Sequence, residues 1–339
     1  MNNFSYQKAT DVNHAISIIN ENAENKIIAG GTNLIDLMKY FVTEAETLVD
    51  INKISDINEL LELPNGGVRL GALMTNADTA YHPMIEERYP LLSKAILAGA
   101  SAQIRNMATN GGNLLQRTRC YYFYDIHTPC NKREPGSGCS AINGYNRIHA
   151  ILGHSENCIA VFPSDMCVAL AALDAVVRIS GPDGNRTVEF SDFHRLPGDT
   201  PQIDNNLKLG EIITGIELPE KGFSENYSYL KLRDRSSYSF ALVSVATGLE
   251  LEKGKIKEAR IALGGVSHKP WRVKEAEDFL IEKTPNADNF AQAAEIILKG
   301  AQGFKDNNFK IDLAKKAIVR NCMMALDPTS QRPGAKPSL

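Results

Sequence analysis

The sequence predicts an α+β protein with a two-lobed first domain and a separate C-terminal domain. Three observations lead to this fold class. Short strands and helices alternate over residues 1–60, and strands mix with helices over residues 67–220. From residue 227 onward, antiparallel strands come first and helices follow, which is typical of a separate α+β domain. The length of 339 residues allows two or three domains.

The expected boundaries follow changes in composition. The segment near 221–226 is loop-like, and the chain from Pro328 onward contains proline, serine and glycine and is expected to be a disordered tail. We therefore expect a first domain over residues 1–222, with lobes over 1–60 and 61–222 and a cysteine-rich loop over 116–160. A C-terminal domain is expected over 226–327 and a tail over 328–339.

The first lobe begins with an amphipathic helix predicted over residues 10–22. Thr10 or Asp11 is a suitable N-cap, and the apolar residues that follow recur at helical spacing. Short apolar runs predict strands over 27–29 and 47–51. The lobe is therefore a small α/β unit.

A glycine turn, Gly30-Gly31-Thr32-Asn33, separates the first of these strands from a helix that begins near Leu34. Two adjacent glycines remove Cβ atoms from the turn, so an anion can approach the backbone. Backbone N–H groups in front of a helix N-terminus form a phosphate cradle. The same pattern also occurs in plain turns, and its spacing is neither the G-x-G-x-x-G of a nicotinamide fold nor a P-loop.

A second turn of the same kind, Thr109–Leu115, follows a strand predicted over 67–73 and a helix predicted over 91–104. An extended flavin dinucleotide bound between two lobes needs one diphosphate held between two glycine turns that are far apart in sequence. The pair of turns therefore predicts FAD, whereas either turn alone predicts only a turn.

Residues 116–160 break the periodic pattern and are rich in proline, glycine, arginine and cysteine. Four of the six cysteines lie here, at Cys120, Cys130, Cys139 and Cys158. A loop of this length inside a compact domain needs something to order it, and a metal centre would do so. Four spread cysteines suit a [4Fe–4S] cluster, whereas zinc sites favour paired C-x2–4-C knuckles. Zinc, a disulfide and free thiols stay open on spacing alone.

Regular structure resumes after this loop. A helix is predicted over 163–173 with Ser164 or Asp165 as its N-cap, and a β-hairpin follows over 174–190. The C-terminal domain is predicted to begin with three strands, over 227–233, 240–252 and 256–266. Three helices are predicted to follow, over 274–283, 287–300 and 311–326.

Some residues near these elements allow two interpretations. Lys231 begins a charged segment, 231–238, that either reaches a flavin or its phosphates or is a solvated strand end. Asp165 is either a helix cap or a partner of the ribose or flavin. Cys167 and Cys322 lie on apolar helix faces and are expected to be buried thiols.

Composition and motifs exclude several function classes. The net charge of −3, without a basic run, argues against nucleic-acid binding. The most apolar window, Cys167–Val177, contains Asp174 and is too short to span a bilayer, so no membrane insertion is expected. The N-terminus lacks a secretory signal. Neither H-E-x-x-H nor G-x-S-x-G occurs, so we expect no hydrolase chemistry and no catalytic residue in this chain.

Six segments together resemble a known family: IAGGTNLIDLM (28–38), the run 105–125, PCNKREPGSGC (129–139), FPSDM (162–166), and the runs 231–246 and 262–272. They are similar to the FAD-binding subunits of the molybdenum hydroxylases, the xanthine dehydrogenase family, from residue 1 to about 326. The cysteine loop narrows the resemblance to the periplasmic aldehyde oxidoreductase type, whose flavin subunit carries an extra [4Fe–4S] cluster.

The resemblance implies a FAD-binding domain of the vanillyl-alcohol-oxidase (PCMH) type, followed by a C-terminal domain of the carbon monoxide dehydrogenase flavoprotein type. It implies FAD contacts at Ile28, Ala29, Gly30, Gly31, Thr32, Asn33, Leu34, Thr109, Gly112, Asn113, Asp165 and Lys231. It also implies that Cys120, Cys130, Cys139 and Cys158 ligate the cluster. Asn110 departs from the family pattern, and its side chain is expected to crowd the diphosphate or to hydrogen-bond to it.

The function implied is that of an electron-transfer subunit. A large partner would hold the molybdenum cofactor and oxidise an aldehyde to a carboxylate, and a small partner would carry [2Fe–2S] clusters and pass electrons through FAD to an external acceptor. The alternatives are a stand-alone FAD oxidoreductase of the same fold, the FAD subunit of a xanthine or hydroxybenzoyl-CoA-type hydroxylase, and a zinc-loop interaction module that binds no flavin. The expected compartment is the cytoplasm, or the periplasm if a signal-bearing partner exports the folded subunit.

Overall fold

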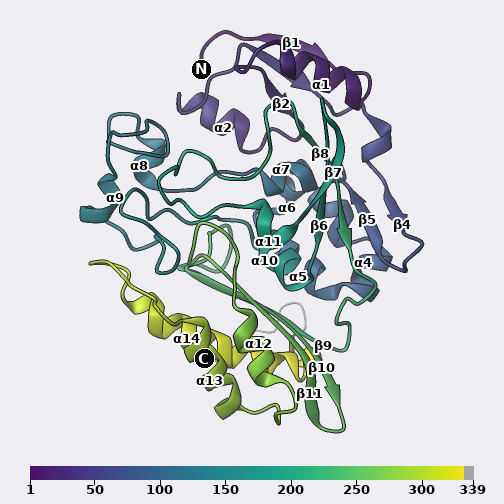
Figure 1. Cartoon of the computed structure of the whole chain (residues 1–339), viewed down its shortest axis with the longest axis vertical. Coiled ribbons are helices and arrows are strands. Elements are labelled where there is room, and N and C mark those ends of the chain that lie inside the picture. Colours follow the sequence, from purple (N-terminus) through teal and green to yellow (C-terminus); the bar gives the residue numbers. More distant parts are fainter. Residues whose placement is uncertain (332–339) are drawn as a thin grey trace.

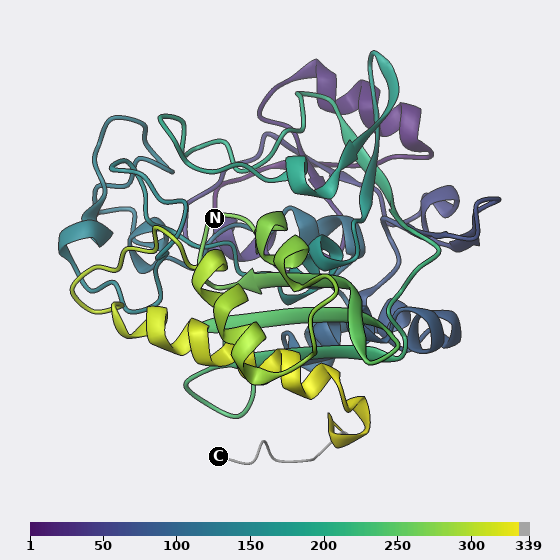
Figure 2. The same cartoon turned by 60° about the horizontal axis from the view of Figure 1, so that its bottom comes forward.

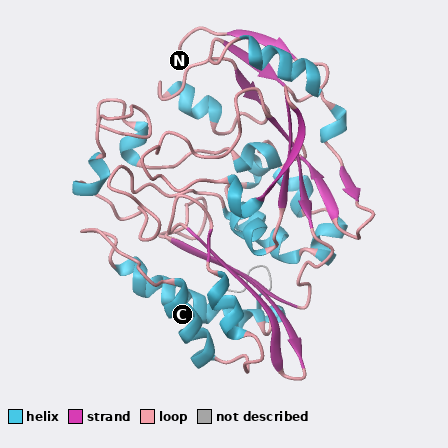
Figure 3. Ribbon diagram, in the orientation of Figure 1, coloured by secondary structure: helices cyan, strands magenta, loops and turns pink. Residues whose placement is uncertain are grey.

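The computed structural model describes residues 1–331 and contains three separate sheets, which Figures 1 and 3 show from the same side. Two of the sheets belong to the N-terminal part of the chain. The third, with the last helices, lies at the opposite end of the molecule. Figure 1 also shows the loop that carries α8 and α9 projecting to one side between these two parts. The α+β fold class is confirmed.

The first lobe is a three-stranded parallel sheet in the order β1-β3-β2, covered by α1. Asp11 caps α1, because its side chain accepts a hydrogen bond from the backbone N–H of His14. The predicted helix and two strands are present, whereas β1 was not expected from the sequence. The elements are β1 (Ser5–Lys8), α1 (Val12–Glu21), β2 (Lys26–Ile28), α2 (Leu34–Lys39) and β3 (Thr47–Asp50).

The second lobe is built on a five-stranded sheet in the order β4-β5-β8-β6-β7. Its central strand β8 was not expected from the sequence, although Ile212-Ile213-Thr214 is a β-branched run. The elements are η1 (Ser55–Ile57), β4 (Leu60–Glu62), β5 (Val68–Gly71), α3 (Asn76–Ala80), α4 (Pro83–Arg88), α5 (Pro90–Ala98), α6 (Ala102–Arg105), α7 (Asn110–Leu114), α10 (Asp165–Ala172), β6 (Val176–Gly181), β7 (Gly184–Glu189), α11 (Phe190–Phe193) and β8 (Ile212–Leu218).

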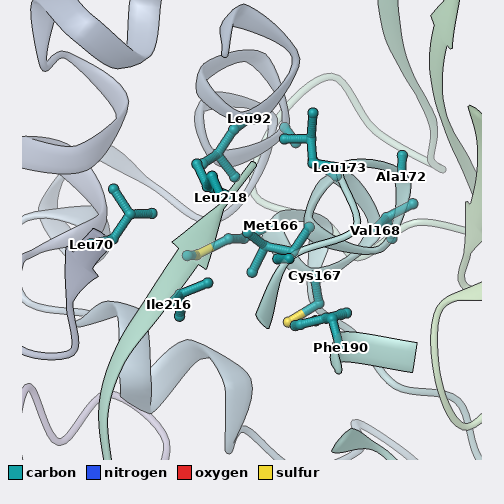
Figure 4. Close-up of a cluster of buried hydrophobic side chains, with 14 of the residues drawn as sticks. Leu70, Leu92, Met166, Cys167, Val168, Ala172, Leu173, Phe190, Ile216 and Leu218 are labelled. Carbon is teal, nitrogen blue, oxygen red and sulfur yellow. The ribbon is translucent and has the colours of Figure 1, made fainter. Parts of the chain in front are cut away.

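The main core of this lobe lies between the five-stranded sheet and the helices α5 and α10. Figure 4 shows Met166 and Cys167 of α10 among Leu92, Ile216 and Leu218. Cys167 is fully buried, as predicted. Ser164 is the N-cap of α10, because its side chain accepts a hydrogen bond from the N–H of Cys167. Asp165 is therefore the first helical residue rather than the cap.

The helix predicted over 91–104 is wrong in its length, since the structure has two helices there. The first, α5, ends at Ala98, and the second, α6, begins at Ala102. Ala100 between them has φ +50°, a left-handed conformation that an α-helix cannot contain. The break turns the backbone of Gly99 and Ala100 toward the large cavity described below.

The cysteine-rich loop, 116–160, contains only the one-turn helices α8 (Tyr121–Tyr124) and α9 (Ser140–Asn143). Side chains hold the rest of its backbone. The Asn131 side-chain oxygen accepts from the N–H groups of Gly136 and Gly138, and the fully buried Asn146 side chain donates to backbone oxygens around α9. These hydrogen bonds satisfy backbone groups of the loop that have no partner in a helix or strand.

The C-terminal domain has an antiparallel sheet in the order β12-β11-β10-β9, with three helices on one face. Figure 2 shows α12, α13 and α14 across that face, and a second core lies beneath them. Buried Cys322 belongs to this core, as predicted. The elements are β9 (Asn226–Leu232), β10 (Val243–Glu252), β11 (Lys255–Gly264), β12 (Trp271–Arg272), α12 (Lys274–Leu280), α13 (Ala287–Ile297) and α14 (Phe309–Ala325).

The other face of this sheet packs on the second lobe of the N-terminal part, since Tyr229, Ala246 and Ala262 join the core around α10. The chain after α14 makes a short 3-10 turn, η2 (Pro328–Gln331), where the sequence predicted the start of a disordered tail. The remainder of that tail, 332–339, lies outside the described residues. Among the residues that are described, no helix has both the length and the apolar composition needed to cross a membrane.

Candidate functional site: a cavity between two glycine turns

One large cavity, of about 870 Å³, lies where the two lobes and strand β9 meet. All twelve residues that the sequence predicted as FAD contacts line it: Ile28, Ala29, Gly30, Gly31, Thr32, Asn33, Leu34, Thr109, Gly112, Asn113, Asp165 and Lys231. They come from β2 and the following turn, from α7, from α10 and from β9. Ligand pockets of drug-sized molecules are of this volume, so the space suits an extended dinucleotide.

The first glycine turn is pressed against the chain that enters the second. A Cβ atom on Gly30 would lie 1.8 Å from the backbone oxygen of Met107, so only glycine fits there. Gly31 has φ +68°, which also favours glycine. The backbone N–H groups of Gly30, Gly31 and Thr32 have no acceptor among the described residues, and all three residues line the cavity. The turn therefore presents a row of free donors, as an anion-binding nest requires.

The second glycine turn differs, because its N–H groups already have acceptors within the protein. Those of Asn110 and Gly111 donate to the backbone oxygens of Met74 and Ala72, and that of Gly112 donates to the Thr109 hydroxyl at 3.3 Å. The second turn is therefore a rigid wall joined to β5 rather than a set of free backbone donors.

Asn110 neither crowds the cavity nor reaches into it. Its side chain is fully buried and faces the core, where Nδ2 donates to the Gly71 backbone oxygen at 3.2 Å and to the Thr79 hydroxyl at 2.9 Å. Its Oδ1 accepts from Asn76 Nδ2 at 3.2 Å. Both outcomes expected for this side chain were wrong, since it fastens the turn to β5 and α3 instead.

Two asparagines connect the turns to neighbouring elements. Asn33 Oδ1 accepts from the backbone N–H of Arg117 at 2.8 Å, which joins the first turn to the start of the cysteine loop. Asn113 Oδ1 accepts from the Ser164 hydroxyl at 2.5 Å and from Gln116 Nε2 at 2.8 Å. The walls of the cavity are therefore cross-linked by side-chain hydrogen bonds.

At one end of the cavity, Asp165 and Lys231 form a buried ion pair. Lys231 Nζ lies 2.7 Å from Asp165 Oδ2, and their side chains are only 4% and 8% exposed. The interpretation of Lys231 as part of a solvated strand end is therefore wrong. The Tyr229 hydroxyl donates to Asp165 Oδ1 at 2.6 Å, and burial together with the Asp165 carboxylate raises the pKa of Tyr229 well above its usual value.

The cavity also has walls beyond the twelve predicted contacts. The segment 207–213, before and within β8, lines one part, and Arg235, Tyr238 and Phe240 of the β9–β10 connection line another. Arg119 lies over the Phe240 ring, 5.1 Å from its centroid, and so connects the cysteine loop to the C-terminal domain. No motif marks the segment 207–213, whereas Arg235 and Tyr238 belong to the charged segment 231–238, for which contact with a flavin was one of two interpretations.

The four loop cysteines converge on a second, much smaller cavity. Cys120, Cys130, Cys139 and Cys158 all line a space of about 10 Å³, which is roughly the size of one water molecule. All four thiols are free, and only Cys139 is partly exposed. His149 Nε2 lies 3.1 Å from Cys120 Sγ.

The thiols of this cluster are not equivalent. The Cys158 thiol hydrogen-bonds to Cys139, which lowers the pKa of Cys139 and raises that of Cys158. Burial raises the pKa of Cys120 to about 12 and lowers that of His149 to about 4. The arrangement therefore has one readily ionised thiol, Cys139, at its exposed edge.

Two observations disagree on whether these four cysteines form a metal centre. Four sulfur ligands without any carboxylate suit iron–sulfur or zinc. However, within residues 1–331 no group of three or more His, Cys, Asp or Glu side chains is placed to hold a metal ion. The predicted [4Fe–4S] ligand set of Cys120, Cys130, Cys139 and Cys158 is thus gathered in one place but is not supported as a formed metal site.

Comparison with known proteins defines the class. Residues 2–221 match the family model for the FAD-binding domain in molybdopterin dehydrogenase, and residues 227–321 match that for the C-terminal domain of carbon monoxide dehydrogenase flavoprotein. The chain belongs to the FAD-binding subunits of the molybdenum hydroxylases. It is therefore an oxidoreductase subunit, and FAD is the cofactor of its family.

Particular relatives make this more specific. The chain is 44% identical to the aldehyde oxidoreductase FAD-binding subunit PaoB of Escherichia coli, over 94% of this chain and 97% of that protein. It is 29% identical to the glyceraldehyde dehydrogenase medium chain of Sulfolobus acidocaldarius, over 84% and 83%. The carbon monoxide dehydrogenase structure from Hydrogenophaga pseudoflava has the same fold, with a TM-score of 0.75 and 23% identity over 96% of this chain and 97% of that one.

Proposed function

We propose that this protein is the FAD-binding electron-transfer subunit of a molybdenum-dependent oxidoreductase that converts an aldehyde to a carboxylate. The observation that carries the proposal is the single cavity bounded by both glycine turns, with the free N–H donors of Gly30, Gly31 and Thr32 on its wall. The 44% identity to an aldehyde oxidoreductase subunit supports the aldehyde as substrate class.

The residues of the cavity divide into three tasks. The first turn, Ile28 to Leu34, would hold the FAD diphosphate through its backbone donors. Thr109, Gly112 and Asn113 would form the opposite wall of the diphosphate site. Asp165 and Lys231 would lie near the flavin ring, where the ammonium group favours negative charge on the ring system. When bound, FAD supplies the capacity to collect two electrons and release them to an acceptor.

The partners would be a large subunit with the molybdenum cofactor and a small subunit with [2Fe–2S] clusters. Relatives are named as medium chains or as FAD-binding subunits, which supports a multi-subunit assembly. Electrons would reach this subunit from the small partner and leave to an external acceptor. The subunit would fold in the cytoplasm and either stay there or be exported together with a partner that carries a signal.

The loop cysteines would bind a [4Fe–4S] cluster. Support comes from the donor set, because Cys120, Cys130, Cys139 and Cys158 line one cavity without a competing carboxylate. The cavity is small, so cluster binding requires the loop to open around it. Since a loop with little regular structure gains its order from a bound metal, binding and loop folding would be coupled.

A UV–visible spectrum of the purified full chain, with released flavin, iron and zinc measured on the same sample, tests this function. Flavin bands with about four irons per chain support both FAD and the [4Fe–4S] cluster. Flavin without iron retains the FAD subunit and removes the cluster. Zinc without flavin contradicts the function altogether, because the two glycine turns would then be only turns.

A further inference from the structure

Strand β9 and the residue after it carry three polar side chains that cross the domain boundary. Tyr229 and Lys231 are two residues apart, so they share one face of the strand, and Arg233 follows directly after its last residue, Leu232. All three reach the FAD-binding domain. Tyr229 and Lys231 donate to the two carboxylate oxygens of Asp165, at 2.6 and 2.7 Å, and Lys231 and Arg233 donate to the Ala98 backbone oxygen, at 3.1 and 3.3 Å.

Tyr229 differs from the other two groups of this network in its position. Asp165 and Lys231 line the large cavity, whereas Tyr229 does not and lies behind them in the core. A buried carboxylate needs hydrogen-bond donors on its oxygens, and the Tyr229 hydroxyl satisfies Oδ1. Oδ2 is then the oxygen that meets Lys231, so the hydroxyl fixes the direction in which the carboxylate presents its charge.

The Lys231 ammonium group has three N–H donors. Among the described residues two of them have acceptors, namely Asp165 Oδ2 and the Ala98 oxygen. The third N–H is available to a ligand in the cavity that Lys231 lines. The position of Asp165 thus decides where this remaining donor lies.

We infer that Tyr229 is a positioning residue of the flavin site: its hydroxyl fixes Asp165, which holds the Lys231 ammonium at the cavity wall with one N–H free for bound FAD. The inference rests on the proposed function. Without the hydroxyl, Asp165 Oδ1 has no donor, and the carboxylate turns to pair with Lys231 through both oxygens. The positive charge is then drawn toward Asp165 and away from FAD.

This change weakens the binding of reduced FAD more than that of oxidised FAD, because reduced FAD carries more negative charge. We expect Tyr229→Phe to weaken the binding of reduced FAD relative to oxidised FAD by roughly tenfold. For a two-electron couple a tenfold change in this ratio makes the flavin midpoint potential about 30 mV more negative.

Tyr89→Phe is the matched control. Tyr89 is also buried, and its hydroxyl donates to the Pro219 backbone oxygen at 2.6 Å, but Tyr89 does not line the cavity. The full chain with each substitution is titrated with FAD, and its flavin midpoint potential and melting temperature are measured. Tyr229→Phe should shift the potential, whereas Tyr89→Phe should change only the melting temperature. An unchanged potential in Tyr229→Phe, or equal shifts in both variants, overturns the inference.

A double-mutant cycle separates positioning from a general loss of stability. In a Lys231→Met background, Tyr229→Phe should shift the potential no further, because the group that it positions is gone. Additive shifts overturn the inference. If the wild-type chain binds no FAD, the proposed function is overturned as well. If the wild-type chain binds FAD normally but Tyr229→Phe leaves the flavin midpoint potential unchanged, only the inference is overturned.

Discussion

The large cavity and the cysteine cavity are built in opposite ways. The large cavity takes its walls from strands and helices of two domains, and close backbone contact sets its shape, as at Gly30 and Met107. The cysteine cavity takes its walls almost entirely from one loop, whose backbone is held by side chains such as Asn131 and Asn146. The first should exist before its ligand arrives, and the second should depend on its ligand for order.

The largest effect is expected from a substitution that disrupts the large cavity. Gly30→Ala places a Cβ atom 1.8 Å from the Met107 oxygen, so the two turns must separate. We expect loss of FAD binding and a decrease of about 3 kcal/mol or more in the free energy of unfolding. Flavin content and urea denaturation measure both.

Gly254→Ala is the control for this substitution. Gly254 has φ +76° with no atom near its would-be Cβ, so alanine there should cost only about 1–2 kcal/mol and leave FAD bound. If Gly30→Ala behaves like Gly254→Ala, the turns do not form one site.

The next largest effect is expected from a substitution that disrupts only the cysteine cavity. Cys130→Ser should lose most of the iron and expose residues 116–160 to protease by more than about tenfold, because a bound metal contributes several kcal/mol to local folding. Most of the flavin should remain. Iron analysis and limited proteolysis with mass spectrometry provide the readout.

Cys322→Ser, in the C-terminal core, is the matched substitution and should keep all of the iron. A Cys130→Ser protein with full iron and an intact loop would remove Cys130 from the ligand set. One that loses flavin as completely as Gly30→Ala would contradict the independence of the two cavities.

Protonation of His194, which lies next to the second turn, should lower the stability of the protein at acid pH. Burial lowers the pKa of this histidine to about 4, and its Nε2 bonds to the Leu114 oxygen at the end of the second turn. The unfolded chain binds a proton below pH 6.5 and the folded chain only near 4, so stability falls as the pH drops between these values. The contribution of this group is about 3 kcal/mol. His194→Gln keeps a donor without a titrating ring and should flatten this part of the stability profile; an unchanged acid slope would assign the effect to other groups.

The smallest effect concerns the contact between the two regions. Phe240→Ala removes the ring beneath Arg119, a contact worth about 0.5–1 kcal/mol. FAD should dissociate roughly two- to fivefold faster, as stopped-flow fluorescence would show. Phe240→Tyr retains a ring and should behave like the unaltered chain. Equal rates in all three proteins would show that the cysteine loop does not influence the flavin.

The contrast between the two regions also explains what the sequence could predict. Ten of the twelve cavity residues lie in two glycine turns next to apolar runs, and short-range rules detect such patterns. Asp165 and Lys231 lie outside the turns, and only the family resemblance assigned them to the flavin site. The wall at 207–213 carries no local signal, because it reaches the cavity only through the sheet. The charge pattern of 231–238 left two interpretations open, and only the domain contact brings Arg235 to the cavity. The direction of the Asn110 side chain was likewise decided by distant partners, Gly71 and Thr79.

Errors in the predicted elements have the same origin. The single helix predicted over 91–104 has continuous helical spacing, yet Ala100 adopts a left-handed conformation that brings its backbone to the cavity. Strand β8 has apolar residues that do not alternate strictly, because it is buried at the centre of the sheet and a register shift lies in its pairing with β6. Tertiary contacts outweigh local periodicity in both places.

The position of β8 also bears on how this chain is synthesised. Strands β5 and β6 do not pair with each other; both pair with β8, which begins more than 140 residues after β5 starts. On the ribosome, the first lobe can form its parallel sheet early, but the five-stranded sheet must wait until residue 218 has emerged. The cysteine loop lies between β5 and β8 in sequence and leaves the exit tunnel before β8 does, so its thiols are accessible to assembly factors before the five-stranded sheet closes.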